Sequence, residues 1–123
     1  MSGLNKVMLI GFLGRDPEIK TTTSGDSVAT FSIATSESWI SNGERQERTE
    51  WHNIVAWKKL AELAQKYLVK GQQVYIEGKI QTREYQGRDD IKRKVFEIIA
   101  SQIVFLGKAP RDKDEPEEEG IPF

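Results

Sequence analysis

The stretch that decides the fold is Thr49-Glu50-Trp51-His52-Asn53-Ile54-Val55-Ala56-Trp57. Its polar and apolar residues alternate with a period of two, which is the pattern of a strand with one buried face. Residues of one parity lie on one face of a strand, so Trp51 and Trp57 are predicted to point the same way, with Val55 between them. Two indoles on one face make either a core surface or a platform for flat ligands, and the rest of the sequence must decide between these.

Apolar periodicity predicts the other elements of the chain. Strands are expected at residues 4–14, 27–39, 45–57, 72–85 and 92–106, and one helix at residues 58–70. Residues 18–26 are polar and predict a connection with a turn at Ser24-Gly25-Asp26, whereas Asn42-Gly43 is a favoured hairpin pair. Three strands, one helix and two strands is the order of the OB fold, a five-stranded Greek-key barrel. We therefore predict an all-β protein with its one helix after the third strand.

Composition limits the classes of protein that this chain can form. Its 123 residues suit one domain with one core, which we place at residues 1–107, followed by a tail at residues 108–123. The lack of cysteine excludes a disulfide framework, and the single histidine, His52, does not suffice for a zinc site. No apolar run approaches the about 20 residues that span a bilayer, and residues 1–6 lack the long apolar region of a signal peptide. We expect no cofactor, no metal and no membrane association.

Charge is distributed unevenly along the chain. The net charge is −1, but residues 112–123 hold six acids and one base, whereas residues 1–111 carry 17 bases and 13 acids. The body is therefore mildly basic, at +4, and the end is acidic. Such a chain can bind a polyanion with one part and repel it with the other. From Lys108 onward, prolines and charges replace the apolar pattern, which predicts a disordered acidic tail.

The aromatic residues exceed what a small barrel needs in its interior. We expect Phe31, Phe96 and Phe12 to help fill the core, and Val7-Met8-Leu9-Ile10 to form a strand buried on both faces. Among the aromatics that remain are Trp39, Trp51, Trp57, Tyr75 and Tyr85. Exposed rings interleaved with basic residues suit single-stranded nucleic acid, because bases stack on the rings while Lys and Arg bind the phosphates. The alternative is that these rings belong to a core or an interface, since tryptophan is usually largely buried.

No catalytic group of residues is evident. His52 is the only histidine that could act as a general base, and carboxylates such as Glu77 and Glu84 are expected as solvated charges on strand faces. Gly11-Phe12-Leu13-Gly14 lacks the Gly-Lys-Ser/Thr ending of a phosphate-binding loop. We therefore predict that the chain is not an enzyme.

The end of the acidic tail has a more specific pattern than its composition. Its acids precede the apolar tip Ile121-Pro122-Phe123. A carboxylate on a terminal phenylalanine, preceded by acids, can dock in a basic pocket with an apolar floor. The same composition is typical of a plain solubilising tail, so the residues alone leave both roles open.

Short segments along the chain resemble the bacterial-type single-stranded DNA-binding protein (SSB) family. They run in the family's order and cover nearly the whole chain, and they are specific jointly rather than singly. The segments are Asn5-Lys6-Val7, Gly11-Phe12-Leu13-Gly14-Arg15-Asp16-Pro17-Glu18, Ala34-Thr35-Ser36-Glu37-Ser38-Trp39, Thr49-Glu50-Trp51-His52, Lys59-Leu60-Ala61-Glu62, Tyr67-Leu68-Val69-Lys70-Gly71, Val74-Tyr75-Ile76-Glu77-Gly78 and Ile121-Pro122-Phe123.

This resemblance implies an OB fold that assembles as a homotetramer in the cytoplasm, on the bacterial nucleoid or in the host of a phage or plasmid. It also implies sequence-independent binding and protection of single-stranded DNA in replication, recombination and repair. The family's base-stacking aromatics fall on Trp39, Trp51, Trp57 and Tyr85, and basic positions of its DNA path fall on Lys6, Lys59, Lys70 and Arg83. His52 and Tyr75 fall where the family places residues of the subunit interface.

The acidic tip is similar to the family segment that recruits replication and repair proteins. The tip residues are Asp114, Glu115, Glu117, Glu118, Glu119, Ile121, Pro122 and Phe123. Family members usually carry a long linker before the tip, whereas here residues 108–120 are available. A short linker gives the tip a short reach and a high effective concentration near its own barrel.

Two other functions stay open at the level of sequence. In the first, the barrel is mainly a scaffold that presents the acidic tip to protein partners, and substitution of the aromatics would leave this adaptor role intact. In the second, the barrel binds RNA, and competition between matched DNA and RNA oligomers would reveal it. The sequence has no evident reader of the RNA 2′-hydroxyl group.

Overall fold

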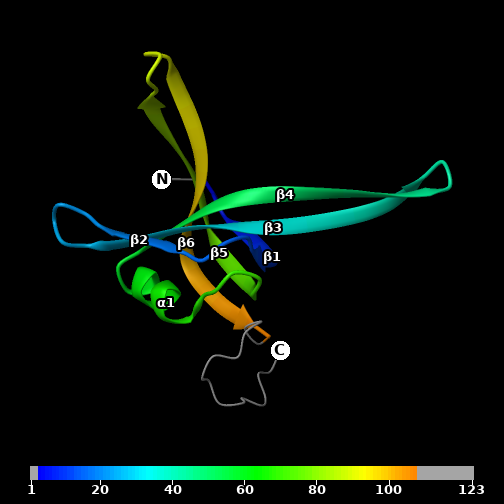
Figure 1. The fold of residues 1–123 in the computed structure, drawn as a ribbon, viewed down its shortest axis with the longest axis horizontal. Coiled ribbons are helices and arrows are strands. Elements are labelled where there is room, and N and C mark those ends of the chain that lie inside the picture. The colour runs from blue at the N-terminus through cyan, green and yellow to red at the C-terminus, as the bar shows by residue number, and fades with distance from the viewer. Residues whose placement is uncertain (1–2, 108–123) are drawn as a thin grey trace.

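The computed structural model describes residues 3–107, which form six strands and one helix (Figure 1). In chain order the elements are β1 (Val7–Leu13), β2 (Glu18–Thr21), β3 (Ser27–Ser41), β4 (Glu44–Trp57), α1 (Lys59–Tyr67), β5 (Gln73–Gln86) and β6 (Lys92–Leu106). Every predicted strand and the predicted helix is present, and β2 is an addition to them. The predicted tail at residues 108–123 lies outside the described residues.

Five of the strands close into a barrel. Hydrogen bonding runs in the order β1-β5-β6-β4-β3, and β1 also pairs with β3, which closes the ring. These pairings are antiparallel except for β4 with β6, which is parallel at Ile54↔Ile98 and Val55↔Ile99. A closed five-stranded barrel with one helix before its last two strands is the OB architecture, so the predicted fold class is confirmed.

The additional strand β2 lies on the outer edge of β3. The turn after it is closed by the Thr22 N–H, which donates to the Asp26 carbonyl at 2.9 Å, and by the Gly25 N–H, which donates to the Thr22 carbonyl at 2.9 Å. β2 carries no period-two pattern, because Ile19 is its one apolar residue. Owing to β2, α1 follows the fourth strand of the structure instead of the third.

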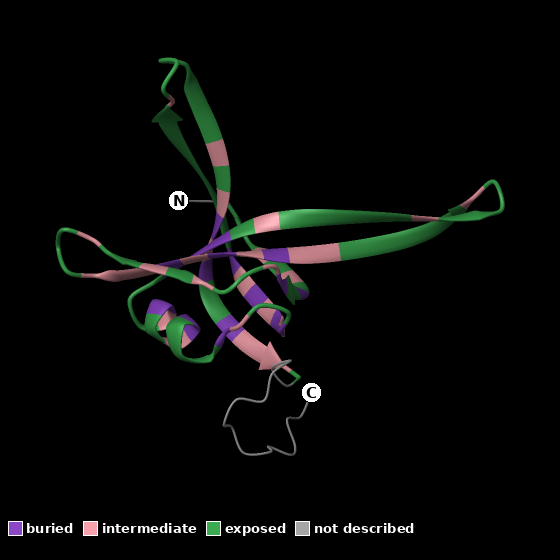
Figure 2. Ribbon diagram, viewed as in Figure 1, coloured by how far each residue is buried: buried purple, intermediate pink, exposed green. Residues whose placement is uncertain are grey.

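The core lies where the strands cross, and Figure 2 shows the buried residues concentrated there. Ala29, Phe31 and Ile33 alternate along β3 and are fully buried, as the sequence predicted for Phe31. The helix packs against β3 and β4, and Ala61 and Ala64 are its buried residues. Because both side chains are methyl groups, the helix can lie close to the sheet.

The helix α1 ends at Tyr67, three residues before its predicted end. Leu68 is buried and would have extended the apolar pattern, but its backbone is extended (φ −90°, ψ 134°). The chain must turn there to reach β1, where the Gly71 N–H donates to the Leu13 carbonyl at 2.9 Å. Gly71 has a φ of 88°, in the left-handed region that favours glycine.

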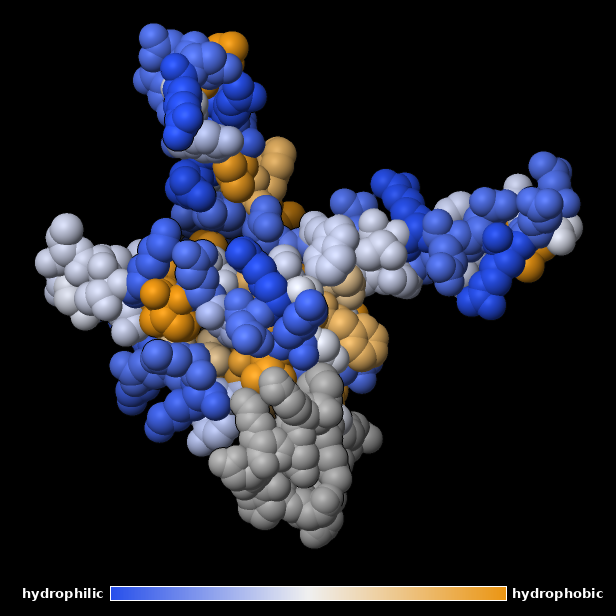
Figure 3. Space-filling view, viewed as in Figure 1, coloured by the Kyte–Doolittle hydropathy of each residue, from blue (hydrophilic) through white to orange (hydrophobic). Residues whose placement is uncertain are grey.

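The hairpins of β3 with β4 and of β5 with β6 extend far beyond the barrel, and we call them the β3–β4 arm and the β5–β6 arm (Figure 1). The register of β3 with β4 continues to the Asn42-Gly43 turn, and that of β5 with β6 continues to the loop at residues 87–91. Asn42 and Gly43 have φ values of 51° and 77°, as the predicted two-residue turn requires. The outer parts of both arms are exposed and largely hydrophilic (Figures 2 and 3). Backbone pairing holds them together more than apolar burial does.

Barrel closure depends on a close approach of β1 to β3. The ladder between the two strands consists of Phe12↔Ala34 and Leu13↔Ile33. Gly11 lies against this contact, where a Cβ atom would overlap with the carbonyl oxygen of Ala34 and lie 2.6 Å from Cγ2 of Ile33. The closing strands therefore require glycine at this position.

Gly11→Ala is expected to destabilise the protein by about 1–3 kcal/mol, the usual cost of overpacking, because the added methyl group pushes β1 away from β3. Urea unfolding followed by circular dichroism measures this change. The matched control is Gly87→Ala in the β5–β6 loop, where the nearest atom to the added Cβ is the side-chain Oδ1 of Asp89 at 3.1 Å. An equal loss in both variants would show that the approach of β1 to β3 is not the cause.

Candidate nucleic-acid interface

Residues 49–57 lie in β4, and both of their tryptophans face away from the barrel interior. Ile54 and Ala56, of the other parity, are buried in the core, whereas Trp51 and Trp57 are 56% and 42% exposed. The two tryptophans are six residues apart, which is about 20 Å along a strand. The predicted shared face is therefore the outer face of the barrel.

The indole of Trp51 lies against Gly14, just after the end of β1. A Cβ atom at Gly14 would overlap with Cζ3 of the indole and lie 2.8 Å from its Cη2. In the register of β3 with β4, Trp51 is directly opposite Ala34, whose side chain is a single methyl group. Two small residues thus leave the space in which this ring lies on the barrel surface.

Basic residues that are distant in the sequence meet near this ring. Arg15 directly follows Gly14, and the backbone N–H of Lys70 donates to Oδ1 of Asp16 at 2.8 Å. This bond brings the loop after α1 to the end of β1. Arg15 and Lys70 are both exposed, and within residues 3–107 neither takes part in an ion pair. The structure therefore places the predicted basic residue Lys70 on the part of the barrel that carries Trp51.

Trp57 lies beside a second group of basic residues. Lys58 and Lys59 follow it directly and are exposed. Val28 is opposite Trp57 on one side and opposite Lys20 of β2 on the other, so Lys20 shares the face of Trp57. The predicted Lys59 is the first residue of α1, which fixes its backbone next to the tryptophan.

Trp39 and Tyr85 lie on the two arms, away from the two tryptophans of the barrel. Trp39 has the parity of Phe31 in β3, so it lies on the opposite face of the β3–β4 arm from Trp51. Tyr85 lies on the β5–β6 arm, directly opposite Arg93. A single chain therefore brings two of the four predicted aromatics onto one face and places one on each arm.

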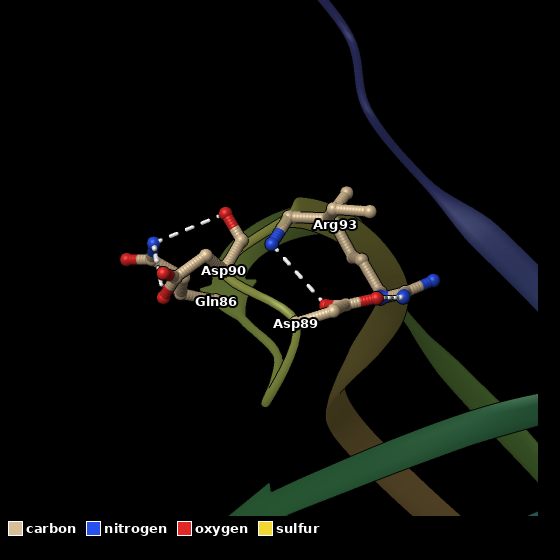
Figure 4. A network of polar contacts seen from close by, with 5 residues as sticks. Gln86, Asp89, Asp90 and Arg93 are labelled. Atoms are coloured by element: carbon tan, nitrogen blue, oxygen red, sulfur yellow. Dashed lines mark hydrogen bonds and ion pairs between the residues drawn. The ribbon is translucent and has the colours of Figure 1, made fainter.

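Side chains hold the loop at the tip of the β5–β6 arm (Figure 4). Arg93 forms an ion pair with Oδ2 of Asp89 at 2.6 Å. Nε2 of Gln86 donates to the carbonyl oxygen of Asp90 at 3.2 Å. The guanidinium of Arg93, the residue directly opposite Tyr85, is therefore bound to the loop.

Two of the predicted basic residues are engaged with carboxylates. Nη2 of Arg83 donates to Oε2 of Glu97 at 2.8 Å, and this hydrogen bond, with the charge of Glu97, raises the pKa of Arg83 above its ordinary value. Nζ of Lys6 lies 3.1 Å from Oε2 of Glu77. A phosphate group would have to compete with these carboxylates for both cations.

Tyr75 lies with Glu77 and Lys6 on the outer face of the barrel. Its hydroxyl donates to Oε1 of Glu77 at 2.7 Å, which is the main reason why the pKa of Tyr75 is raised and that of Glu77 is lowered. Lys6 lowers the pKa of Glu77 further. Met8 and Ile10 of β1 are directly opposite Glu77 and Tyr75 and are exposed. An apolar strand face thus flanks the polar cluster.

His52, the other predicted interface residue, lies elsewhere. It is half-buried opposite Ile33 in the register of β3 with β4, on the core-facing parity. Its Nε2 lies 2.9 Å from Oγ1 of Thr35. Within one chain, His52 and Tyr75 are therefore on different faces.

Two phenylalanines that were expected in the core are exposed, Phe12 by 52% and Phe96 by 66%. In β1 the odd-numbered residues face the core and the even-numbered ones face outward, so the expectation of a strand buried on both faces is wrong for this chain. Phe96 has the core-facing parity of β6 but lies beyond the barrel, opposite Thr82 on the arm. The charged run Lys92-Arg93-Lys94 just before Phe96 was the signal that this part of β6 leaves the core.

Phe96 lines an open groove between the arms, where β4 and β6 diverge. Residues 50–53 of β4, Ile80 of β5 and residues 94–98 of β6 form its walls. Its charges are mixed, because Glu50 and Glu97 accompany Lys94. Carboxylates repel phosphates, so the outer face of β4 is the better candidate for a nucleic-acid interface.

The described residues offer little for other classes of site. Within residues 3–107, no group of three or more His, Asp or Glu side chains is placed to hold a metal ion. The helix in this part of the chain is too short to cross a membrane.

Comparison with known proteins agrees with this architecture. The profile of the Single-strand binding protein family matches residues 4–106.

The chain belongs to this family.

A Neisseria meningitidis protein named Single-stranded DNA-binding protein is 53% identical over 119 residues, which cover 95% of this chain and 68% of the relative. Single-stranded DNA-binding protein 1 of Chlorobaculum tepidum is 54% identical over 107 residues, which cover 85% of this chain and 66% of the relative. The chain thus spans about two thirds of the length of these relatives.

A solved structure described as the Plasmodium falciparum SSB complex with ssDNA is also similar. It has a TM-score of 0.81 and 39% sequence identity, and the match covers 87% of this chain and 98% of that chain. Proteins of the family bind single-stranded DNA and are not catalysts, so the prediction that this chain is not an enzyme is confirmed.

Gly14→Ala is expected to weaken binding of an oligo-dT strand as much as Trp51→Ala does, because the added methyl group displaces the indole from the barrel surface. Stacking of one base on a ring is worth about 1–3 kcal/mol, which sets the size of both losses. Fluorescence anisotropy of labelled oligo-dT measures the affinity.

The double variant provides the control, since residues that act through one ring are not additive. In the Trp51→Ala background, Gly14→Ala should cause no further loss. A full additional loss in that background would show that Gly14 does not act by positioning Trp51.

Proposed function

We propose that this protein binds single-stranded DNA without sequence preference. The proposal is carried by the composition of the outer face of β4, where Trp51 and Trp57 are exposed and each lies beside basic residues. Within residues 3–107, these basic residues form no ion pairs. Rings stack on bases while cations follow the phosphates, which is the usual way that OB folds bind single strands. Membership of the family, and the likeness to a structure described as a complex with ssDNA, support the same conclusion.

The proposed path runs over the barrel and continues onto the arms. On the barrel, Trp57 with Lys59 and Trp51 with Lys70 form two ring-and-cation pairs about 20 Å apart along the strand. The arms add further contacts at Trp39, Tyr85 and Arg83, and Lys6, just before β1, adds one on the barrel. Stacking accepts every base and phosphate contacts carry no sequence information, so this set of residues gives affinity without base selectivity.

The biological role that we propose is coating and protection of single strands during replication, recombination and repair. A strand held on rings and cations is removed from re-pairing and from nuclease attack. This role rests on the resemblance to the family together with the proposed binding.

We also propose that the acidic tip recruits replication and repair proteins. The residues concerned, 114–123, lie outside the described part of the chain, and the proposal rests on their sequence. Acids followed by Ile121-Pro122-Phe123 suit a basic pocket with an apolar floor on a partner.

Titration with oligo-dT is expected to quench the tryptophan fluorescence to saturation, because Trp51 and Trp57 stack on bases. Log K should fall linearly with log salt, by about 0.7 for each phosphate that the protein neutralises. Lys59→Ala should make this slope shallower by about 0.7, since it removes one such contact.

Lys66→Ala, an exposed lysine in the last turn of the same helix, is the matched control and should leave the slope unchanged. Flat fluorescence on a folded sample would contradict the proposal and favour the adaptor function. Equal competition by matched RNA would change the class of ligand.

The assembly that we propose is a homotetramer whose interface includes Tyr75 and, on another face, His52. Exposed Met8 and Ile10 beside Tyr75 support the first of these contacts.

Light scattering should therefore give four times the chain mass of 14.0 kDa. Tyr75→Glu should lower this mass. The new carboxylate cannot donate a hydrogen bond to Glu77 as the Tyr75 hydroxyl does, it repels the Glu77 carboxylate, and it offers no aromatic ring to bury in the interface. An unchanged mass in that variant would exclude Tyr75 from the interface.

A further inference from the structure

An exposed phenylalanine lies in one row with Trp51 across the outer face of the barrel. Phe12 of β1 is directly opposite Ala34 of β3, and Ala34 is directly opposite Trp51 of β4. Directly opposed residues of neighbouring strands lie on the same face. Phe12 is 52% exposed and Trp51 is 56% exposed, so both rings are open to solvent on this face.

Small residues lie between these two rings and beside the indole. Ala34 separates them with a single methyl group, and two strand spacings put the backbones of Phe12 and Trp51 about 10 Å apart. The indole reaches β1 at Gly14, two residues beyond Phe12, where no side chain rises from the surface. Successive bases of a strand can therefore reach both rings without an obstacle between them.

The charges at this place favour phosphate. The row continues from Phe12 to Gln73 of β5, so Gln73, Phe12, Ala34 and Trp51 are all uncharged. Arg15 lies just beyond Gly14 and Lys70 lies beside it, and within residues 3–107 neither is in an ion pair. Single-stranded DNA over the two rings would meet these cations, and the carboxylate beside them, that of Asp16, already accepts a hydrogen bond from the N–H of Lys70.

Phe12 also differs in position from the other exposed residues of β1. Met8 and Ile10 have their directly opposed partners in β5, at Glu77 and Tyr75, which is the face proposed for subunit contact. Phe12 lies at the other end of the strand and is the exposed residue of β1 that pairs with β3 as well. Phe12 therefore borders Trp51 through Ala34 on one side and, diagonally on the other side, Tyr75, so the molar mass of its variants must be measured together with their affinity.

We propose that Phe12 is a further base-stacking residue, which forms with Trp51 a subsite for two consecutive bases of single-stranded DNA. Arg15 and Lys70 bind the phosphates beside this subsite. The inference rests on the proposed function and adds to it a ring and a cation that the sequence analysis assigned to the core or left unassigned.

The experiment measures the affinity of full-length variants for labelled oligo-dT by anisotropy, with the molar mass from light scattering. Phe12→Leu keeps an apolar side chain without a ring and should weaken binding about fivefold to a hundredfold, the range for loss of one stacked base. Phe12→Tyr keeps the ring and should bind as the unsubstituted chain does. Arg15→Ala should lessen the salt dependence by one phosphate contact.

The matched control is Tyr67→Leu, which removes a ring of nearly equal exposure, 54%, on α1. It should bind oligo-dT normally. Trp51→Ala serves as the reference for loss of a stacking ring in the same row. Circular dichroism confirms that each variant is folded. Phe12→Leu and Phe12→Tyr both keep a large side chain at this position, and only the second keeps the ring.

Normal binding by Phe12→Leu, while Trp51→Ala is weakened, would overturn the inference and leave the proposed function intact. A lowered molar mass in Phe12→Leu would also overturn it, because Phe12 would then belong to the subunit interface. Failure of the unsubstituted chain itself to bind oligo-dT would instead remove the proposed function on which the inference rests.

Discussion

Closure of the barrel depends on backbone contact between β1 and β3 at a place where a side chain would intervene. Gly11 lies against the carbonyl oxygen of Ala34, and the N–H of Gly14 continues the contact by donating to the Ser32 carbonyl at 3.0 Å. The lack of a side chain at Gly14 also leaves the space that the indole of Trp51 occupies. The seam of the barrel and the candidate binding surface are therefore the same part of the molecule. A change that separates β1 from β3 disturbs the fold and moves the ring at the same time.

The arms obey a different constraint, because their strands are longer than the barrel needs. Beyond the core both faces of each arm meet solvent, so backbone pairing and cross-strand side-chain pairs of about 0.2–1 kcal/mol each remain to hold them. Exposed ion pairs such as Arg48 with Glu50 add little, about 0–1 kcal/mol. Segments with few buried apolar contacts open at low free energy. The barrel thus holds Trp51 and Trp57 at fixed positions relative to each other. Trp39 and Tyr85 instead lie on arms that can adjust to single-stranded DNA, which has no fixed shape.

The sequence predicted the parts of the structure that periodicity encodes, namely the OB order and the shared face of Trp51 and Trp57, and turn chemistry predicted the Asn42-Gly43 turn. It could not predict β2, because a four-residue edge strand with Ile19 as its one apolar residue carries no pattern. Phe12 and Phe96 have the apolar character of core residues, which predicts burial, and yet both are exposed. Exposure depends on where a strand leaves the barrel and on which strands are its neighbours, and both are properties of the closed fold. The proximity of Lys70 to the end of β1 likewise follows from long-range hydrogen bonds, of Lys70 to Asp16 and of Gly71 to Leu13.

The distribution of ion pairs divides the proposed binding surface into two parts. Arg15, Lys59 and Lys70 on the barrel are in no ion pair within residues 3–107, so a phosphate at these sites releases counterions without displacing a carboxylate. On the β5–β6 arm, a phosphate must displace Glu97 from Arg83, and the hydrogen bond that it breaks is the one that raises the pKa of Arg83. The net gain there is the difference between two charge-assisted bonds and is small. Salt-dependent affinity therefore arises mainly on the barrel, whereas the arms contribute through their rings, whose stacking depends little on salt.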